Sequence, residues 1–408
     1  MEIDNKIISE YKNVYKFKKA GNHTVYILLD IKKLDSLHLF NGTNNLKSIE
    51  FSKHFNTENI TSLESLFYSC HSLESVDISN FNLEKVENID RMFYFCESLT
   101  TIKFPNSTTP NLKNMSFTFT ECLSLSSIDL TFLNTENVEN MFFTFFDCVS
   151  LASIDLSNFN TKNVVKMAGM FANCESLTSV DMSNFITDKL EYMNNLFQGC
   201  YLLKSIDLSN FNTENVYNMA ALFLGCDSLE YVNLSSFKTS KNTDLTSFFN
   251  GCESLTSVDI SHFDTSKVES MNVMFANCFS LKSLNISNFD TSKVTRMAAM
   301  FAGCSNLTSL NITNFNTESL VEMDYFLEDC ISLTSIDLSS FNTEKIPNMT
   351  EVFTNCTNLS YIDISSFSDS TDYFNLFIGL PENVTIVINS KIKDKLNISD
   401  SWNIISVN

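Results

Sequence analysis

The chain has 408 residues, of which 44% are hydrophobic, and a net charge of −21 from 48 acidic and 27 basic residues. The apolar fraction is large enough to bury a sizeable core. An acidic chain without a Lys or Arg run argues against nucleic acid and against an anionic membrane surface as partners. No apolar run approaches the roughly 18 residues of a membrane span, so membrane insertion is not expected either.

Residues 1–43 are expected to form an N-terminal cap that closes the open end of the core. The stretch "NHTVYILLD" (22–30) is predicted to be a strand, and Leu34, Leu37 and Leu39 indicate a second one. The first twenty residues lack the apolar core of a secretory signal peptide. The sequence as written therefore predicts a cytoplasmic location.

Residues 44–380 are dominated by one phrase, such as "CESLTSVDIS" (252–261), which returns every 26 residues. A constant period of this size indicates a solenoid. Side chains at equivalent positions of neighbouring coils point the same way, which disfavours disulfides between them. Zinc is less favoured still, because His is scarce and no C-x₂-C pair occurs. We therefore expect reduced, buried thiols at all twelve cysteines: Cys70, Cys96, Cys122, Cys148, Cys174, Cys200, Cys226, Cys252, Cys278, Cys304, Cys330 and Cys356.

The first half of each repeat is predicted to be a short strand and a turn. With Cys as position zero, apolar residues at three, six and eight indicate a strand with one buried face, as in Leu255, Val258 and Ile260. Phe occupies position eleven in ten of the twelve repeats, and Ser107 and Leu133 are the exceptions. This column is predicted to form a buried aromatic spine.

The second half of each repeat is predicted to be a short helix. In "FNTENVYNMAALFLGC" (211–226), apolar residues at positions sixteen, nineteen, twenty-three and twenty-six follow a helical stripe. Thr213 is the predicted N-cap, and Glu214 suits the positive start of a helix. Gly, Asn or Asp precedes Cys in nine of the twelve repeats, as expected for a left-handed residue that ends a helix.

The motif L-x-x-L-x-L followed by this apolar stripe resembles a leucine-rich repeat. The version "SLTSVDISHFDTSKVESMNVMFANC" (254–278) is similar to the 26-residue repeat of BspA-like bacterial surface proteins. The resemblance covers about residues 44–380. It implies an α/β fold: a right-handed solenoid with strands on the concave face and short helices on the convex face. It also implies a place at the cell surface and an adhesion-like function. The Phe column stands where the family's asparagine ladder is expected.

Residues 381–408 are expected to form a C-terminal cap. The stretches "NVTIVINS" and "WNIISV" are predicted to be closing strands on either side of "KIKDKL".

An acidic column at position seven, the outward residue of each strand, is the candidate site. Neighbouring strands lie roughly 4.8 Å apart, so consecutive acids would stack. They form either a solvated face screened by Ser at positions five and nine, or a weak divalent-cation stripe. Catalysis is the least favoured alternative, because acid–base chemistry needs two carboxylates in unlike environments. No cofactor or dedicated metal site is expected, and the candidate binding residues are Asp129, Asp155, Asp181, Asp207, Tyr231, Asp259, Asp337 and Tyr361.

The leading functional hypothesis is a non-enzymatic scaffold that presents one extended solenoid face to a protein partner or to a component of a host or cell surface. The alternative is an intracellular structural spacer without a specific ligand. A carboxylate-based hydrolase is the least favoured reading.

Overall fold

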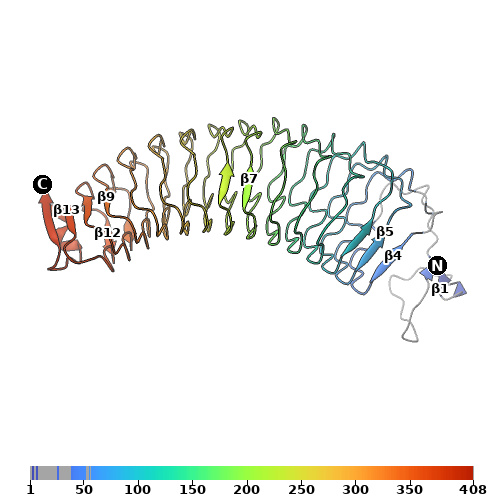
Figure 1. Cartoon of the computed structure of the whole chain (residues 1–408), viewed down its shortest axis with the longest axis horizontal. Helices are drawn as coiled ribbons and strands as arrows, with labels where there is room; N and C mark the ends of the chain where they lie inside the picture. The colour runs from blue at the N-terminus through green and yellow to red at the C-terminus, as the bar shows by residue number, and fades with distance from the viewer. Residues whose placement is uncertain are drawn as a thin grey trace.

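The computed structural model describes residues 38–51, 55 and 57–407, together with the backbone of three short strands nearer the N-terminus. Its coils lie side by side along one long, gently arched solenoid (Figure 1). The N-terminal strands β1 (Glu2–Ile3), β2 (Lys6–Ile7) and β3 (Val25–Tyr26) pair antiparallel. Strand β3 lies inside the predicted strand 22–30, whereas Leu34 and Leu37 lie outside the described residues.

The predicted strand at positions five to seven is present in coils near both ends and in the middle of the solenoid. These strands pair parallel and in register, so that Val76 stands opposite Ile102. Their middle residue is the least exposed of the three, as the alternating pattern predicted. The strands are β4 (Ser48–Glu50), β5 (Ser75–Asp77), β6 (Thr101–Lys103), β7 (Ser205–Asp207), β8 (Tyr231–Asn233), β9 (Ser335–Asp337) and β11 (Tyr361–Ile364).

The predicted helix is wrong: the described residues contain no α-helix. The second half of each repeat is a series of tight turns whose N–H groups alternate between two partners. The N–H of Phe223 donates to Phe248 O of the next coil at 3.0 Å, whereas the N–H of Leu224 donates to Ala221 O of its own coil at 3.4 Å. An α-helix needs every N–H to bond four residues back. Because alternate N–H groups join neighbouring coils instead, this edge forms a second ladder.

Two regular features accompany this second ladder. Isolated parallel bridges join residues at position eighteen, and near the C-terminal end β10 (Asn348–Thr350) pairs with β12 (Asp372–Phe374). In a typical coil both Ala221 (φ 55°) and Gly225 (φ 68°) are left-handed. The left-handed residue before Cys is confirmed, but the additional one at position twenty-one interrupts the run of negative φ that a helix requires.

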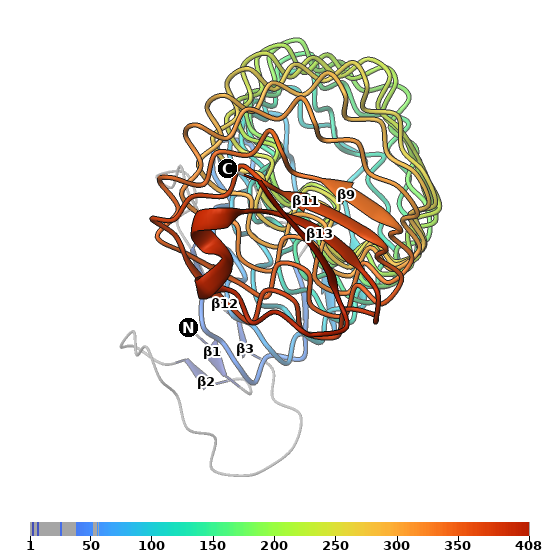
Figure 2. The same ribbon diagram turned by 90° about the vertical axis from the view of Figure 1, so that its left-hand side faces the viewer.

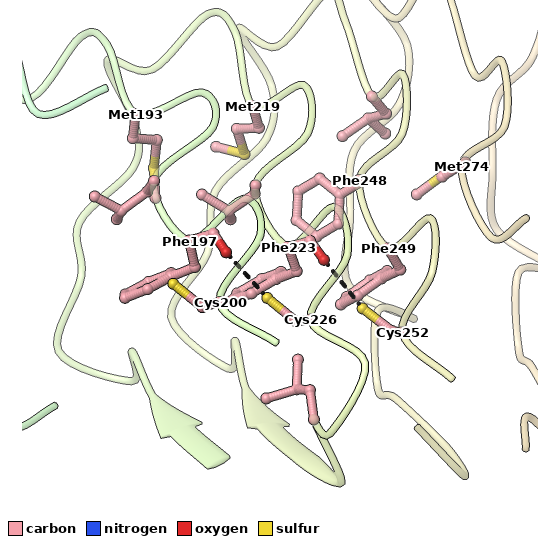
Figure 3. Close-up of a cluster of buried hydrophobic side chains, with 14 of the residues drawn as sticks. Met193, Phe197, Cys200, Met219, Phe223, Cys226, Phe248, Phe249, Cys252 and Met274 are labelled. Carbon is pink, nitrogen blue, oxygen red and sulfur yellow. Dashed lines mark hydrogen bonds between the residues drawn. The ribbon is translucent and has the colours of Figure 1, made fainter. Parts of the chain in front are cut away.

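The core contains two columns of phenylalanine rings. The predicted column at position eleven is buried, and Phe185 and Phe211 stack with centroids 6.3 Å apart. A second column at position twenty-three is more continuous, and Phe223 stacks on Phe197 at 5.8 Å and on Phe249 at 5.5 Å (Figure 3). The predicted aromatic spine is therefore confirmed, and it has a second, parallel partner.

The thiols form a ladder beside this second column. Cys226 donates to Phe197 O at 3.1 Å, and Cys252 donates to Phe223 O at 3.2 Å (Figure 3). All twelve cysteines are buried, as predicted. Burial raises the pKa of Cys200 to about 12, so very little thiolate, the reactive form, exists at neutral pH.

We expect the native protein to react slowly with a thiol reagent and the denatured protein to titrate twelve thiols without added reductant. Cys70, at the N-terminal end of the ladder, should react first. Hydrogen bonding with Cys96, and then with Thr43, lowers its pKa to about 7 against the effect of burial. Rapid modification of every thiol in the native state would contradict the burial described here.

Two polar ladders fasten the turn after the strand. Thr213 does not cap a helix: its Oγ1 donates to Lys238 O at 2.9 Å and accepts the Lys238 N–H at 2.8 Å, both in the next coil. Three residues before Thr213, Asn210 Nδ2 donates to two carbonyl groups of the previous coil, Met182 O at 3.0 Å and Phe185 O at 2.8 Å. The Phe column therefore does not replace an asparagine ladder, because the ladder is present one position earlier.

The predicted closing strands of the C-terminal end are confirmed as β13 (Thr385–Asn389) and β14 (Asn403–Val407). They extend a parallel sheet in the order β14-β13-β11-β9, and a 3₁₀ helix, η2 (Ser390–Lys395), connects them (Figure 2). Trp402 covers the last coil, with its ring 5.4 Å from that of Phe377. Within the described part of the chain, no helix is long and apolar enough to cross a membrane.

Candidate functional site

The predicted site residues all lie on the strand face, which is the surface formed by outward residues at positions five and seven. Asp129, Asp155, Asp181 and Asp207 occupy four consecutive coils and are exposed. Asp259 and Asp337 are also exposed but stand apart, because asparagines occupy position seven in the coils between them. Tyr231, which is 57% exposed, and Tyr361 begin β8 and β11 and lie in distant coils. The structure thus brings together the four consecutive acids and not the whole set.

Each acid of the column accepts a hydrogen bond that closes a local turn. Asp181 Oδ1 accepts the N–H of Ser183 at 2.9 Å, which closes a tight turn directly after the strand. Asn233 makes the same bond to the N–H of Ser235 at 3.2 Å. A side-chain oxygen two residues before the N–H is the requirement of such a turn. This explains why Asp and Asn interchange at position seven, and it supports the solvated-face reading.

These turns also fix the protonation state of the column. The backbone N–H of Ser183 and then its hydroxyl lower the pKa of Asp181. The Thr131 hydroxyl does the same for the pKa of Asp129, against a smaller opposing effect of the Asp155 charge. Because the pKa of each carboxyl is lowered on folding, the stability that its ionised form contributes to the fold is present at neutral pH. This contribution is lost as the pH falls through the folded-state pKa. Carboxylates held in their ionised form are poor general acids.

We expect Asp181→Asn and Asp181→Ala to have different effects on stability. Asn keeps the oxygen that closes the turn and removes a charge from a row of acids, so the melting temperature in low salt should stay constant or rise. Ala removes the turn bond, so the melting temperature should fall. Thermal unfolding at low and high salt measures both. Equal losses for Asn and Ala would show that the charge, and not the turn bond, is what the fold requires.

A hollow of about 400 Å³ interrupts the strand face at the end of β6. It lies where the repeat changes to "KFPNSTTPNLKN" (103–114), the one repeat that contains two of the four prolines. Neither Asp nor Asn stands at position seven of this coil, which carries Lys103 instead. The hollow is lined by Ile102, Lys103, Phe104, Pro105, Asn106, Thr108, Asp129, Thr131 and Phe132.

Local sequence changes account for the hollow. Pro105 stands at position nine, where other coils supply the N–H that closes the turn, and proline has none. Phe132 stands at position ten of the next coil, in place of the asparagine that would bond back to the previous coil. Its ring stacks on that of Phe104, with centroids 3.9 Å apart and planes at 15°. An aromatic pair thus replaces two of the polar bonds that close the surface elsewhere.

The charges around this aromatic pair are of opposite sign. Lys103 Nζ lies 3.1 Å from Asp77 Oδ2 on one side, and the exposed carboxylate of Asp129 lies on the other. The lining contains neither His nor Cys, and its one carboxylate has no second carboxylate in an unlike setting. Among the described residues, no three His, Cys, Asp or Glu side chains are grouped to hold a metal ion. The hollow therefore combines charged, polar and aromatic side chains on one surface.

Sequence reasoning missed the hollow, although its signals were visible. Ser107 breaks the Phe column, Lys103 breaks the acid column, and the two prolines of this repeat stand close together. That Lys103 and Pro105 line one hollow together with Phe132 of the next coil is apparent only in three dimensions.

The sequence matches the family model described as "Mycoplasma protein of unknown function, DUF285" over residues 18–127, 111–206, 191–285 and 274–382. These overlapping matches span most of the chain. The chain belongs to the DUF285 family. The predicted membership of a BspA-like family with 26-residue leucine-rich repeats is confirmed by this match and by the 26-residue coil.

The DUF285 protein is also similar to solved leucine-rich-repeat structures. A protein from Bacteroides ovatus is 21% identical, with a TM-score of 0.45, covering 92% of this chain and 94% of that one. A leucine-rich cell surface protein from Faecalibacterium prausnitzii is 16% identical, with a TM-score of 0.35, covering 83% and 81%. A protein from Eubacterium ventriosum is 18% identical, with a TM-score of 0.35, covering 79% and 81%. No curated protein matches the sequence.

Proposed function

We propose that this DUF285 protein is a non-enzymatic binding scaffold that holds a segment of a protein partner on its strand face, centred on the hollow at Lys103, Phe104, Asp129 and Phe132. The observation that carries the proposal is the hollow itself. It interrupts a regular surface and places a cation, an anion and two stacked rings together. Neighbouring coils supply a rigid, extended surface on either side, as solenoid proteins do for their partners.

The chemistry of the hollow favours an extended peptide over a small metabolite. Its lining comes from two adjacent coils and is continuous with the exposed acids of the strand face, so a bound segment can run across several coils. The aromatic pair offers a surface on which an apolar or planar side chain can stack. The BspA-like resemblance supports the further proposal that the partner belongs to a host or cell surface, that the interaction is adhesion-like and that the protein acts at the cell surface.

A displayed library of random peptides, selected on the immobilised protein, tests this proposal. Enriched peptides should bind the wild type and lose at least tenfold in affinity on the Lys103→Ala/Asp129→Ala variant. The matched control is Asp259→Asn/Asp337→Asn, which changes two exposed acids of the same face in coils remote from the hollow and should leave the affinity within twofold. Peptides that bind both double variants as well as the wild type would overturn the hollow as the site. Failure to enrich any peptide would favour the spacer hypothesis.

A further inference from the structure

A second surface of unusual composition lies on the turn side of the N-terminal coils. Positions twenty, twenty-one, twenty-four and twenty-five carry small or polar residues in most coils, such as Ala221 and Gly225. In residues 68–146, seven of these positions carry half-buried rings instead. We call these rings the aromatic patch: Tyr68, Tyr94, Phe95, Phe117, Phe142, Phe143 and Phe146.

The patch is continuous across four coils. Tyr68 and Tyr94 stack with centroids 5.1 Å apart and planes at 1°. The Tyr94 ring lies 6.1 Å from that of Phe117, which stacks on Phe143 at 5.7 Å and 4°. Phe143 in turn meets Phe146 at 5.0 Å. Tyr and Phe anchors gathered in this way are typical of protein interfaces.

The patch ends at Gly169, the residue of the following coil that lies under the Phe143 ring. A Cβ atom at Gly169 would come within 2.4 Å of that ring, and the residue is left-handed at φ 61°. A side chain at this position would push the ring away. The absence of a side chain at Gly169 therefore allows the Phe143 ring to pack against the next coil, where it forms the edge of the patch.

Carboxylates border the rings. Glu121 and Asp147 follow Phe95 at position twenty-five of the next two coils, and the Glu121 N–H donates to Phe146 O of the patch at 2.8 Å. Burial, and then the Glu121 charge, raise the pKa of Tyr94. Burial raises the pKa of Glu121, as do the charges of Asp147 and Glu97, and burial also raises the pKa of Asp147. Among the described residues neither Glu121 nor Asp147 has an ion-pair partner, whereas Glu97 pairs with His71 at 2.9 Å.

The chain itself places a cation on this surface. The Arg91 guanidinium lies over the Phe117 ring, 4.5 Å from its centroid, and pairs with Asp90. The face of an aromatic ring attracts a cation, most strongly where water is partly excluded. Arg91 thus shows the geometry that further cations would adopt beside the unpaired carboxylates.

We infer that the aromatic patch, with Glu121 and Asp147, is a docking surface for an Arg- or Lys-rich peptide segment of a protein partner. Ring faces and carboxylates attract the same charge, so cationic side chains placed between them would interact favourably with the rings and with both acids. This surface is separate from the hollow on the strand face, so the two can be tested independently.

The probe is a fluorescent octapeptide of alternating Arg and Gly, titrated against the full chain by anisotropy at fixed ionic strength. Glu121→Gln/Asp147→Asn should weaken its binding at least tenfold. The control, Asp155→Asn/Asp181→Asn, removes the same number of charges elsewhere and should change binding less than twofold. Equal weakening by both variants would show non-specific attraction to an acidic chain and would overturn the inference.

Two further variants separate the patch from other surfaces. Phe117→Leu keeps all the acids and should still weaken binding about fivefold or more, with folding checked by its thermal unfolding curve. Lys103→Ala/Asp129→Ala should leave binding of the peptide unchanged. Loss of binding in this last variant would assign the peptide to the hollow. Tighter binding of a matched Leu-Gly peptide would show that the patch selects apolar partners. Either result would overturn the inference, while the hollow is tested by its own selected peptides.

Discussion

Replacing Phe223 with Ala should lower the free energy of unfolding by about 3–5 kcal/mol, the range for a large buried aromatic side chain. Phe223 is fully buried, and its ring stacks on Phe197 and Phe249 in the two neighbouring coils. Its removal leaves a cavity that rigid coils on both sides cannot fill. Urea-induced unfolding followed by circular dichroism measures the effect.

The matched control for this variant is Tyr231→Ala in the adjacent coil. Tyr231 is 57% exposed, so its loss should change stability by no more than about 0.5 kcal/mol. Hydrogen exchange should show lost protection in the coils around Phe223 and little change near the ends, because each coil contacts only its neighbours. A loss below about 1 kcal/mol for Phe223→Ala would contradict the stacked column.

Replacing Thr213 with Val should cost about 2–4 kcal/mol, although the two side chains have nearly the same shape. The hydroxyl bonds both the N–H and the C=O of Lys238. A buried polar group that loses its partner costs about 1–3 kcal/mol, and Val leaves two such groups. Both groups are only partly buried, so the lower part of the summed range of about 2–6 kcal/mol is expected. The midpoint of urea unfolding gives the value.

Thr213→Ser is the control, because it keeps the hydroxyl and removes one methyl group. Its cost should be about 1 kcal/mol. Equal costs for Val and Ser would mean that packing of the methyl group, and not the bridge to the next coil, is what Thr213 contributes.

Residues with one physical role in every coil could be predicted from the sequence. Cys226 and Phe211 recur at fixed intervals, and such a column has to be buried in a solenoid. The strand could be predicted equally well, because the alternation of apolar and polar residues around Val258 distinguishes its buried face from its exposed face. These features depend on side-chain polarity alone, which the sequence shows directly.

The backbone structure of the second half of the coil could not be predicted from side-chain polarity in the same way. Met219 and Phe223 are spaced by four residues, and this spacing buries one side of a helix and of a series of turns equally well. The backbone determines which of the two forms: alternate N–H groups donate to carbonyls of the next coil, and Ala221 adopts a positive φ, so turns form and a helix does not. Thr213 was misassigned for the same reason, because its partner is 25 residues away.

The hollow and the aromatic patch were missed because both arise from departures from the repeat. Phe132 and Phe143 look like additional apolar residues when the sequence is searched for its regular columns. Whether these rings belong to the core or to a surface feature depends on the side chains of the neighbouring coil, which lie about one repeat away along the chain.

The bonds between coils have a further consequence for how the protein can change in length. From Cys96 onwards each thiol donates to a carbonyl 29 residues earlier, and Thr213 and its equivalents bond a residue 25 positions later. An insertion of one or two residues in a central coil would shift one set of partners relative to the other and break both. Duplication or deletion of a whole 26-residue coil would preserve every bond. Among the regular coils from Cys96 to Cys356, the length of the solenoid can therefore change only in steps of one 26-residue coil, whereas coils of other lengths occur only near the two ends, where Ser48 pairs with Ser75 and Tyr361 with Thr385.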